Sequence, residues 1–458
     1  MEHFALAVIG AGSGNAVIPS DPAEPVALIE SGAFGGTCIN RGCIPSKMLA
    51  HTAEVARTVR EAATFGVGAE LTGVDWPAIR DRTFAQVEKV SGAGRRGREE
   101  SDQVRLISGR ARFTGPHELV IDDRTPISAD RIVLATGARP VIPPVIADSG
   151  VPFETSDTVM RIDKLPETIL IVGGSYIAAE FAHIFSSLGV TIRLVNQADR
   201  LLEAFDTDIS DRFTALGRKR WDVHLSAEIT GVSSGGGGTG TGVALALRDG
   251  TTVTGDLLLV AAGRAPDTGD LDLDQAGVRL REDGRIEVDE FGRTAAGHIW
   301  ALGDVSSPYE LKHVANAEAR TIKHNLAHPQ DLRPLPHDWV PAAVFSEPQV
   351  ATVGARQQDL AGQRRYVQAT KEYGDVAYGW ALQDTSGFCR IYADPASGEL
   401  LGAHIIGYQA SLLIQPLVQA ASTGLRVHEM ARGQYWIHPA LSEVVENALL
   451  ALPLDDHR

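Results

Sequence analysis

The chain has few cysteines, no long hydrophobic run and a deficit of positive charge. Only three cysteines occur among its 458 residues, which excludes the disulfide framework of a small secreted protein. No apolar run approaches the roughly 20 residues that a membrane span needs, and Glu2 stands where a secretion signal carries positive charge. We therefore expect a cytoplasmic protein.

Acidic residues outnumber basic ones. The 58 Asp and Glu against 42 Lys and Arg give a formal net charge of −16, which repels nucleic acid phosphates and anionic membranes. The length suffices for roughly three domains, and 44% of the residues are hydrophobic, enough to build their cores. The expected partners are small molecules and a second copy of the chain.

Two cysteines, Cys38 and Cys43, lie five residues apart in GGTCINRGCIPSKM. In a regular helix this spacing separates the Cα atoms by roughly 8 to 9 Å, whereas a disulfide needs about 7 Å or less. A bond between them requires an irregular turn, which Gly42 and Pro45 permit. Lys47, one helical turn after Cys43, favours a thiolate. The segment indicates a redox-active pair; the alternative is a buried thiol pair or a weak metal site, and we expect no metal.

A glycine turn follows the first predicted strand. The run ALAVIG leads into a turn with Gly10 and Gly12, a helix is expected next, and the strand VALIE ends at Glu30, twenty residues after Gly10. These are the parts of a βαβ dinucleotide site. Gly12 lets backbone N–H groups approach a pyrophosphate, whose charge the helix dipole favours, and Glu30 accepts hydrogen bonds from ribose hydroxyls. Asn15 replaces the usual third glycine.

A second copy of this pattern begins about 160 residues later. The strand ILIVGG leads into Gly173, and the helix AAEFAHIFSSLG and the strand VTIRLVN follow. Ser175 occupies a position where a glycine is expected, which narrows the space for a pyrophosphate but adds a donor. The duplication predicts two bound dinucleotides; the alternative is a glycine turn that binds nothing.

The end of the strand VTIRLVN bears on the choice of nicotinamide cofactor. An acid there binds the free ribose hydroxyl of NAD, whereas a basic group holds the extra phosphate of NADP. The chain has Asn196 and Gln197 at this point, and Arg200 is the only nearby cation. We predict NADPH, with Arg200 against the 2′-phosphate; the alternative is a solvated surface arginine.

Other segments complete the pattern. The strands RIVLATGARP and IWALGD carry Thr136 and Asp304 where ligands meet the carboxyl edge of a sheet. Residues 233–242 are glycine-rich with no helix after them, so we expect a flexible hairpin loop. Residues 94–100 are predicted to form a solvated helix face, and residues 454–458 a frayed tail.

A histidine and a carboxylate stand together near the end of the chain. Pro439 suits the first position of a helix, which places His438 at the helix mouth and Glu443 in its second turn. A carboxylate that orients a histidine is half of a general acid–base device. The alternative is a helix cap or a surface residue.

Taken together, these segments resemble the pyridine nucleotide–disulfide oxidoreductases, the family of glutathione reductase and dihydrolipoyl dehydrogenase. The likeness rests on the glycine turns, GGTCINRGCIPSK, the ATG and GD strands and HPALSE, in this order over nearly all of the chain. Within the family, GSGN, DTVMRI, DVSSPYELKHVANAEAR, EYGDVAYGW, GYQASLLIQPL and ARGQYWIHPAL are similar to the members that reduce mycothione, the disulfide of mycothiol.

The resemblance implies a glutathione reductase-like α/β fold, with Rossmann-like FAD-binding and NADPH-binding domains and an α+β dimerisation domain. The expected boundaries are 1–150 and 265–335 for FAD, 151–264 for NADPH and 336–458 for dimerisation. It also implies a homodimer, in which His438 reaches the cysteines of the partner subunit.

The resemblance implies roles for the catalytic residues. Cys43 faces the flavin, Cys38 attacks the substrate disulfide, and His438, held by Glu443, protonates the leaving thiolate. Lys47 lies near the flavin and pairs with Glu180, and Tyr176 covers the nicotinamide pocket. The residues implied for FAD are Gly10, Gly12, Ser13, Gly14, Glu30, Gly36, Thr37, Lys47, Thr136, Gly137, Gly303 and Asp304. Those implied for NADPH are Gly173, Ser175, Tyr176, Ile177, Asn196, Arg200, Gly263 and Arg264.

Hydride would then pass from NADPH to FAD, and electrons would pass to the cysteine pair and on to mycothione. Gln197 and Glu203 stand where glutathione reductases tend to carry arginines, which bears on the choice of NADPH. One alternative is a dihydrolipoyl dehydrogenase, which runs this chemistry in reverse, or another reductase of small disulfides. A flavin-carrying scaffold without turnover is the non-enzymatic alternative.

Overall fold

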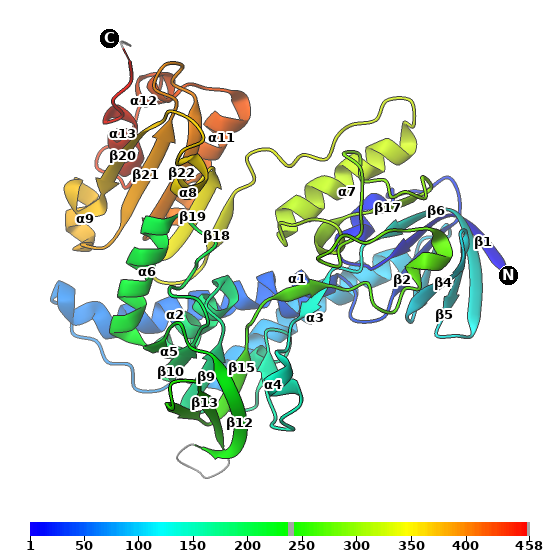
Figure 1. Ribbon diagram of the computed structural model, residues 1–458, viewed down its shortest axis with the longest axis horizontal. Helices are drawn as coiled ribbons and strands as arrows, with labels where there is room; N and C mark the ends of the chain where they lie inside the picture. The colour runs from blue at the N-terminus through cyan, green and yellow to red at the C-terminus, as the bar shows by residue number, and fades with distance from the viewer. Residues whose placement is uncertain (237–241, 456–458) are drawn as a thin grey trace.

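The first sheet carries the amino-terminal glycine turn. The computed structural model describes residues 1–236 and 242–455, and Figure 1 shows this sheet at the right of the view. Its strand order is β3-β2-β1-β6-β5-β4, with β17 paired to β6. The bounds are β1 (Glu2–Ile9), β2 (Val26–Glu30), β3 (Val104–Ser108), β4 (Ala111–Gly115), β5 (Glu118–Ile121), β6 (Thr125–Leu134) and β17 (Ile299–Ala301). The strands β3, β2, β1, β6 and β17 pair in parallel, as in a nucleotide-binding sheet.

The connection from β1 to β2 differs from the prediction. An α-helix was expected after the glycine turn, but the structure has only the four-residue 3-10 helix η1 (Gly14–Val17). Prolines at 19, 22 and 25 follow, and each removes a backbone donor and disfavours a helical residue before it. The expected helix dipole is therefore missing from this turn.

The second sheet carries the second glycine turn. Its order is β11-β10-β9-β15-β8, and all neighbours pair in parallel. The bounds are β8 (Glu154–Thr155), β9 (Thr168–Val172), β10 (Thr191–Val195), β11 (Asp222–His224) and β15 (Leu257–Val260). Here the predicted helix is present as α5 (Tyr176–Ser187), which is mostly buried against the sheet. The second unit thus has the full βαβ form.

Two small antiparallel sheets accompany the first and second sheets. β12 (Ile229–Gly236), β13 (Gly242–Leu247) and β14 (Thr252–Gly255) form one, and β7 (Ala138–Pro140) pairs with β16 (Arg264–Pro266). The strands β12 and β13 extend into the glycine-rich segment further than predicted. Residues 237–241 of the predicted hairpin loop and 456–458 of the predicted tail lie outside the described residues.

The last part of the chain forms an antiparallel sheet with helices, at the upper left of Figure 1. Its order is β18-β19-β22-β21-β20, and the strand β22 is buried along its whole length. The bounds are β18 (Ala342–Val344), β19 (Gln349–Gly354), β20 (Val367–Glu372), β21 (Phe388–Ala393) and β22 (Leu400–Gly407). One α/β unit with a mixed sheet, in which β4, β5 and β6 pair antiparallel, one α/β unit with a parallel sheet and one α+β unit confirm the predicted fold class.

The helices join these sheets. α2 packs against both α3 and α5, and Figure 1 shows α2 and α3 running through the middle of the molecule. The helices are α1 (Gly36–Arg41), α2 (Cys43–Glu61), α3 (Trp76–Glu99), α4 (Pro144–Ala147), α6 (Thr207–Arg220), α7 (Lys312–Ala327), α8 (Gln357–Leu360), α9 (Ala377–Leu382), α10 (Ala410–Leu413), α11 (Gln415–Thr423), α12 (Val427–Arg432) and α13 (Ser442–Leu450), besides α5. Among the described residues, no helix combines the length and the apolar character needed to cross a membrane.

Candidate active site

One large cavity brings together most of the predicted site residues. It has a volume of about 1030 Å³ and is lined by segments from the first and second α/β units and from the carboxy-terminal α+β unit. The predicted residues that line it are Gly10, Gly12, Ser13, Glu30, Gly36, Thr37, Cys38, Cys43, Lys47, Thr136, Gly137, Tyr176, Ile177, Glu180, Arg264, Gly303 and Asp304. Those that do not line it are Gly14, Gly173, Ser175, Asn196, Arg200, Gly263, His438 and Glu443.

The two cysteines lie at a break between two helices. Cys38 belongs to α1, Cys43 is the first residue of α2, and Gly42 separates them. A Cβ atom on Gly42 would lie 3.0 Å from the carbonyl oxygen of Thr37 and 3.3 Å from the Cα of Cys38, so a larger residue would push the two turns apart. Both cysteines are free thiols. The irregular turn expected between them is present.

The two thiols share a proton. The thiol of Cys38 donates a hydrogen bond to Cys43, which lowers the pKa of Cys43 to about 7, and Lys47 lowers it further while burial and Glu180 oppose the shift. The same hydrogen bond, together with burial, raises the pKa of Cys38 well above its ordinary value. The reduced pair therefore carries one negative charge near neutral pH, which lies on Cys43, while Cys38 holds the proton.

Lys47 and Glu180 form an ion pair close to the cysteines. The ammonium of Lys47 lies 2.7 and 2.6 Å from the two carboxylate oxygens of Glu180. The Glu180 side chain is only 9% exposed, and it also accepts a hydrogen bond of 3.0 Å from the backbone N–H of Phe345. Lys47 lies 4.7 Å from the centre of the Phe345 ring. These contacts join α2, α5 and the segment after β18 at the cysteine site.

The two glycine turns share the same steric requirement. Gly10 has φ +105° and Gly173 has φ +126°, which is the region that favours glycine. A Cβ atom would lie 2.3 Å from the carbonyl oxygen of Ala135 at Gly10 and 2.1 Å from that of Ala261 at Gly173. In both units the turn passes directly over the end of a neighbouring strand, so neither glycine can be replaced without a shift of the backbone.

An arginine supports the shortened first turn. Arg98 donates hydrogen bonds to Asn15 Oδ1 at 2.8 Å, to the carbonyl of Asn15 at 3.0 Å, and to those of Pro19 at 3.0 Å and Ile18 at 3.3 Å. Burial lowers the pKa of Arg98. The prediction that residues 94–100 form only a solvated helix face is therefore wrong at Arg98, which holds the segment that replaces the expected helix.

Acidic and hydroxyl groups line the first nucleotide site. Glu30 accepts hydrogen bonds from the backbone N–H groups of Ala11 at 2.8 Å and Gly32 at 2.7 Å, which fixes its carboxylate at the end of β2. Thr136 donates to the carbonyl of Asp267 at 2.8 Å. Burial raises the pKa of Asp304, while Arg264 opposes the shift.

The residues that follow β10 form hydrogen bonds and ion pairs within the protein. The side-chain amide of Asn196 donates to the carbonyl of Arg200 at 3.0 Å. Arg200 itself lies 3.0 Å from both Asp199 and Asp211. The cation that was expected to bind a 2′-phosphate is therefore already paired with two carboxylates. Ser175 is exposed at the start of α5. A phosphate here would have to compete with the acids for Arg200.

His438 and Glu443 are in contact, as predicted, but His438 does not stand at the start of a helix. His438 Nδ1 lies 2.8 Å from Glu443, and this hydrogen bond lowers the pKa of Glu443. The helix α13 begins at Ser442, so Pro439 is not its first residue and Glu443 lies in its first turn. The His438 side chain is 72% exposed. Within one chain it therefore stays outside the cavity.

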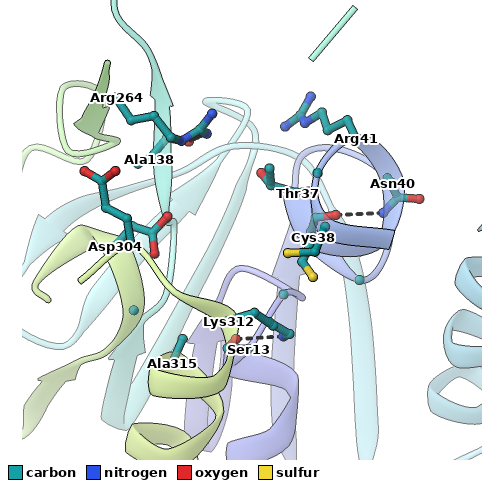
Figure 2. Close-up of a pocket in the computed structure, with 18 of the residues that line it drawn as sticks. Ser13, Thr37, Cys38, Asn40, Arg41, Ala138, Arg264, Asp304, Lys312 and Ala315 are labelled. Atoms are coloured by element: carbon teal, nitrogen blue, oxygen red, sulfur yellow. Dashed lines mark hydrogen bonds between the residues drawn. The ribbon is translucent and has the colours of Figure 1, made fainter. Parts of the chain in front are cut away.

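The sequence reasoning missed a bridge across the cavity and a lysine in it. Asp157 lies 3.3 Å from Arg41, next to the cysteines, and 3.7 Å from Arg264 on the other wall. Lys312 donates to Ser13 Oγ at 2.7 Å, and Figure 2 shows it reaching from α7 to Ser13 below Cys38. The segments DTVMRI and DVSSPYELKHVANAEAR contain Asp157 and Lys312, but no local pattern assigns either side chain to the cavity.

Comparison with known proteins decides the family. A family model for the pyridine nucleotide-disulphide oxidoreductases matches residues 4–319, and a model for the dimerisation domain of the same family matches residues 340–449. The chain belongs to this family. Membership confirms the glutathione reductase-like fold and implies FAD and a nicotinamide dinucleotide as cofactors.

Three relatives place this oxidoreductase more closely. It is 48% identical over 463 residues to mycothione reductase of Mycobacterium tuberculosis, covering 99% of this chain and 100% of the relative. It is 33% identical to dihydrolipoyl dehydrogenase of Chlamydia muridarum, covering 100% and 98%. Among solved structures, the Cu(II) complex of the HOCl-induced flavoprotein disulfide reductase RclA from Escherichia coli matches with a TM-score of 0.87 and 25% identity over 98% of this chain and 99% of that one.

Proposed function

We propose that the protein is a mycothione reductase, which uses electrons from NADPH to reduce mycothione to mycothiol. The observation that carries the proposal is the Cys38–Cys43 pair at the α1–α2 break, whose shared proton leaves a thiolate near neutral pH. The full-length identity of 48% to a mycothione reductase supports the substrate.

The cavity fits FAD. The first glycine turn brings backbone close to the end of β6, Glu30 offers carboxylate oxygens for ribose hydroxyls, and the space continues from there to Cys43 and Tyr176. The proposed holders are the FAD residues named from the resemblance, together with Lys47 near the reactive end. When bound, FAD supplies the transfer of electrons from the nicotinamide to the disulfide.

The chemistry at sulfur follows from the cysteine geometry. Cys38 loses its proton as it attacks one sulfur of mycothione, a mixed disulfide forms, and the first mycothiol leaves as a thiolate that takes up a proton. Cys43 then attacks the sulfur of Cys38, which releases the second mycothiol and restores the Cys38–Cys43 disulfide for the next two electrons. The hydrogen bond between the thiols keeps Cys43 ready for this second attack.

We propose His438 of the partner subunit as the proton donor, with Glu443 as its support. His438 is largely exposed and does not line the cavity of its own chain, while the dimerisation domain of the family spans residues 340–449. Tyr435 and Ile437, just before it, are 103% and 75% exposed, as expected of apolar residues that a second copy covers. The working form would thus be a homodimer.

NADPH is the proposed electron donor, since no acid stands at Asn196, and the proposed NADPH residues are those named from the resemblance. Arg200 would meet the 2′-phosphate only in competition with Asp199 and Asp211. We also propose the domain division at 150, 264 and 335, because β17 returns to the first sheet and the antiparallel third sheet begins at Ala342.

A dihydrolipoyl dehydrogenase is the second candidate, since such an enzyme is 33% identical over the whole chain. The experiment that separates the two is a steady-state panel of mycothione, glutathione disulfide and lipoamide, each with NADPH and NADH. Mycothione with NADPH should give the highest kcat/KM. A clear preference for lipoamide and NADH would overturn the assignment.

The variant Cys38→Ser tests the proposed nucleophile. It should bind FAD and allow NADPH to bleach the flavin, because Cys43 and the cofactor sites remain, while turnover with mycothione falls to background. Flavin absorbance under anaerobic conditions and steady-state rates give the two readings. Wild-type turnover in this variant would remove Cys38 from the mechanism.

A further inference from the structure

Lys312 is the one cation of the cavity that lacks a carboxylate partner among the described residues. Six lysine and arginine side chains line the cavity. Five of them pair with acids: Arg41 and Arg264 with Asp157, Lys47 with Glu180, Arg110 with Asp270, and Arg161 with Glu88. Lys312 is half-buried and its hydrogen-bond partner is the hydroxyl of Ser13. A partly buried charge whose hydrogen-bond partner is neutral is costly, so a bound anion beside it would be favourable.

The place of Lys312 identifies that anion. Its ammonium lies 2.7 Å from Ser13 Oγ, in the glycine turn that faces a dinucleotide pyrophosphate in a βαβ unit. The same serine donates to Asn316 at 3.3 Å, which lies one helical turn after Lys312 on the same face of α7. Two side chains of α7 thus hold this turn, and one of them carries a charge.

The two nucleotide units differ in what they offer an anion. In the second unit α5 has twelve residues and begins directly after the glycine turn, so its dipole can face a pyrophosphate. In the first unit the 3-10 helix η1 has four residues, too few for an appreciable dipole. The first site therefore lacks the usual positive end, and an unpaired ammonium lies beside the same turn.

We propose that Lys312 supplies the positive charge for the diphosphate of FAD, in place of the missing helix after the first glycine turn. This inference rests on the proposed function only in that the first site holds FAD. It makes Lys312 a cofactor-binding residue that comes from α7, 299 residues after Ser13 in the chain.

Other charged groups face the same region and could compete for Lys312. Burial lowers the pKa of Lys312, while the cysteine thiols and Asp304 oppose the shift. If a cysteine thiolate were its true partner, removal of Lys312 would raise the pKa of the cysteine pair and leave FAD binding unchanged. The two roles therefore give different measurements.

The experiment compares FAD binding to the apoprotein of the wild type, Lys312→Met, Lys312→Arg and Lys323→Met. Lys323 lies on the same helix outside the cavity, so Lys323→Met removes the same charge from α7 and serves as the matched control. Quenching of flavin fluorescence gives the dissociation constant at several salt concentrations. The rate of thiol alkylation against pH, followed by mass spectrometry of the Cys38 and Cys43 peptides, gives the pKa of the pair.

Lys312→Met should bind FAD about tenfold or more weakly and with a smaller salt dependence, since a charge-assisted hydrogen bond to phosphate is lost. Lys323→Met should match the wild type, Lys312→Arg should recover most of the affinity, and the pKa of the thiol pair should rise only slightly in Lys312→Met. Equal FAD affinity in Lys312→Met and Lys323→Met would overturn the inference, as would a raised thiol pKa with wild-type FAD affinity. A wild-type protein that takes up no FAD would instead refute the proposed function.

Discussion

The ion pair between Lys47 and Glu180 gives a prediction in which stability and reactivity change in opposite ways. The variant Glu180→Gln keeps an acceptor for the Phe345 N–H but removes the negative charge that both lies within 2.7 Å of Lys47 and raises the pKa of Cys43. Lys47 then acts on the cysteines unopposed. The protein should become less stable while its thiol becomes more acidic.

The magnitude follows from burial. Breaking a fully buried pair costs about 3 to 5 kcal/mol and an exposed pair about 1 kcal/mol or less. Glu180 is 9% exposed but Lys47 is 33% exposed, so solvent screens part of the loss. We expect the free energy of unfolding to fall by about 2 kcal/mol, between these limits. The pKa of Cys43 should drop below its value of about 7.

Denaturant unfolding of the apoprotein and the ultraviolet absorbance of the thiolate against pH measure the two effects. Glu88→Gln is the matched control, because it removes the same charge from a pair in which Glu88 is 64% exposed and Arg161 is 48% exposed. It should change neither quantity by much. A thiol pKa that stays constant or rises in Glu180→Gln would refute the reasoning, because the charge of Glu180 would then not oppose that of Lys47 at the cysteines.

Two histidine variants extend the test to acid stability and turnover. His183 is buried and has its pKa lowered to about 3 from an ordinary value of 6.5 by burial and by Arg220 and Arg57. Between these two pKa values the unfolded state binds a proton at His183 and the folded state does not. The contribution of His183 to the free energy of unfolding is therefore complete above pH 6.5 and is lost as the pH falls from there toward 3. His183→Gln should flatten the loss of stability in this range, as urea unfolding at several pH values would reveal; an unchanged pH slope would assign the acid sensitivity elsewhere. His438→Ala should lower turnover at least tenfold with FAD fully bound, since general acid catalysis contributes roughly 10²- to 10⁴-fold, and an unchanged rate would leave His438 only a structural role.

Local patterns predicted the two dinucleotide-binding units and the cysteine segment, while the resemblance supplied the fold class. The two glycine turns, the strand that ends at Glu30 and the cysteine segment each depend on residues close together in the chain, so their geometry follows from short-range sterics. The pairing of Lys47 with Glu180 came from the resemblance, since the two residues are 133 positions apart and no spacing rule joins them. Short-range stereochemistry therefore predicted the secondary-structure elements, whereas the resemblance predicted the long-range contact.

The wrong predictions have two causes: tertiary contacts that no local pattern shows, and prolines whose helix-breaking effect was not taken into account. The helix expected after Gly12 fails at the three prolines that were visible in the sequence, and Pro439 was placed at a helix start on its local preference alone. Arg98 was taken for a surface charge because nothing near it indicates that it reaches Asn15, 83 residues away. Arg200 was taken as free because the carboxylate of Asp211 approaches it only after α6 has folded against β10.

The contrast between the duplicated units explains where the unpredicted residues lie. Both units keep the glycine that must pass over a neighbouring strand, at Gly10 and Gly173, because no other residue fits. Only the second keeps the helix that normally follows. Without this helix, the backbone carbonyls of the segment and the bound anion need other partners, and side chains from distant segments provide them. Arg98 donates hydrogen bonds to the carbonyls of Asn15, Ile18 and Pro19, and Lys312 lies beside Ser13. A segment that loses a regular element thus acquires long-range cations, and those are the residues that a local pattern cannot predict.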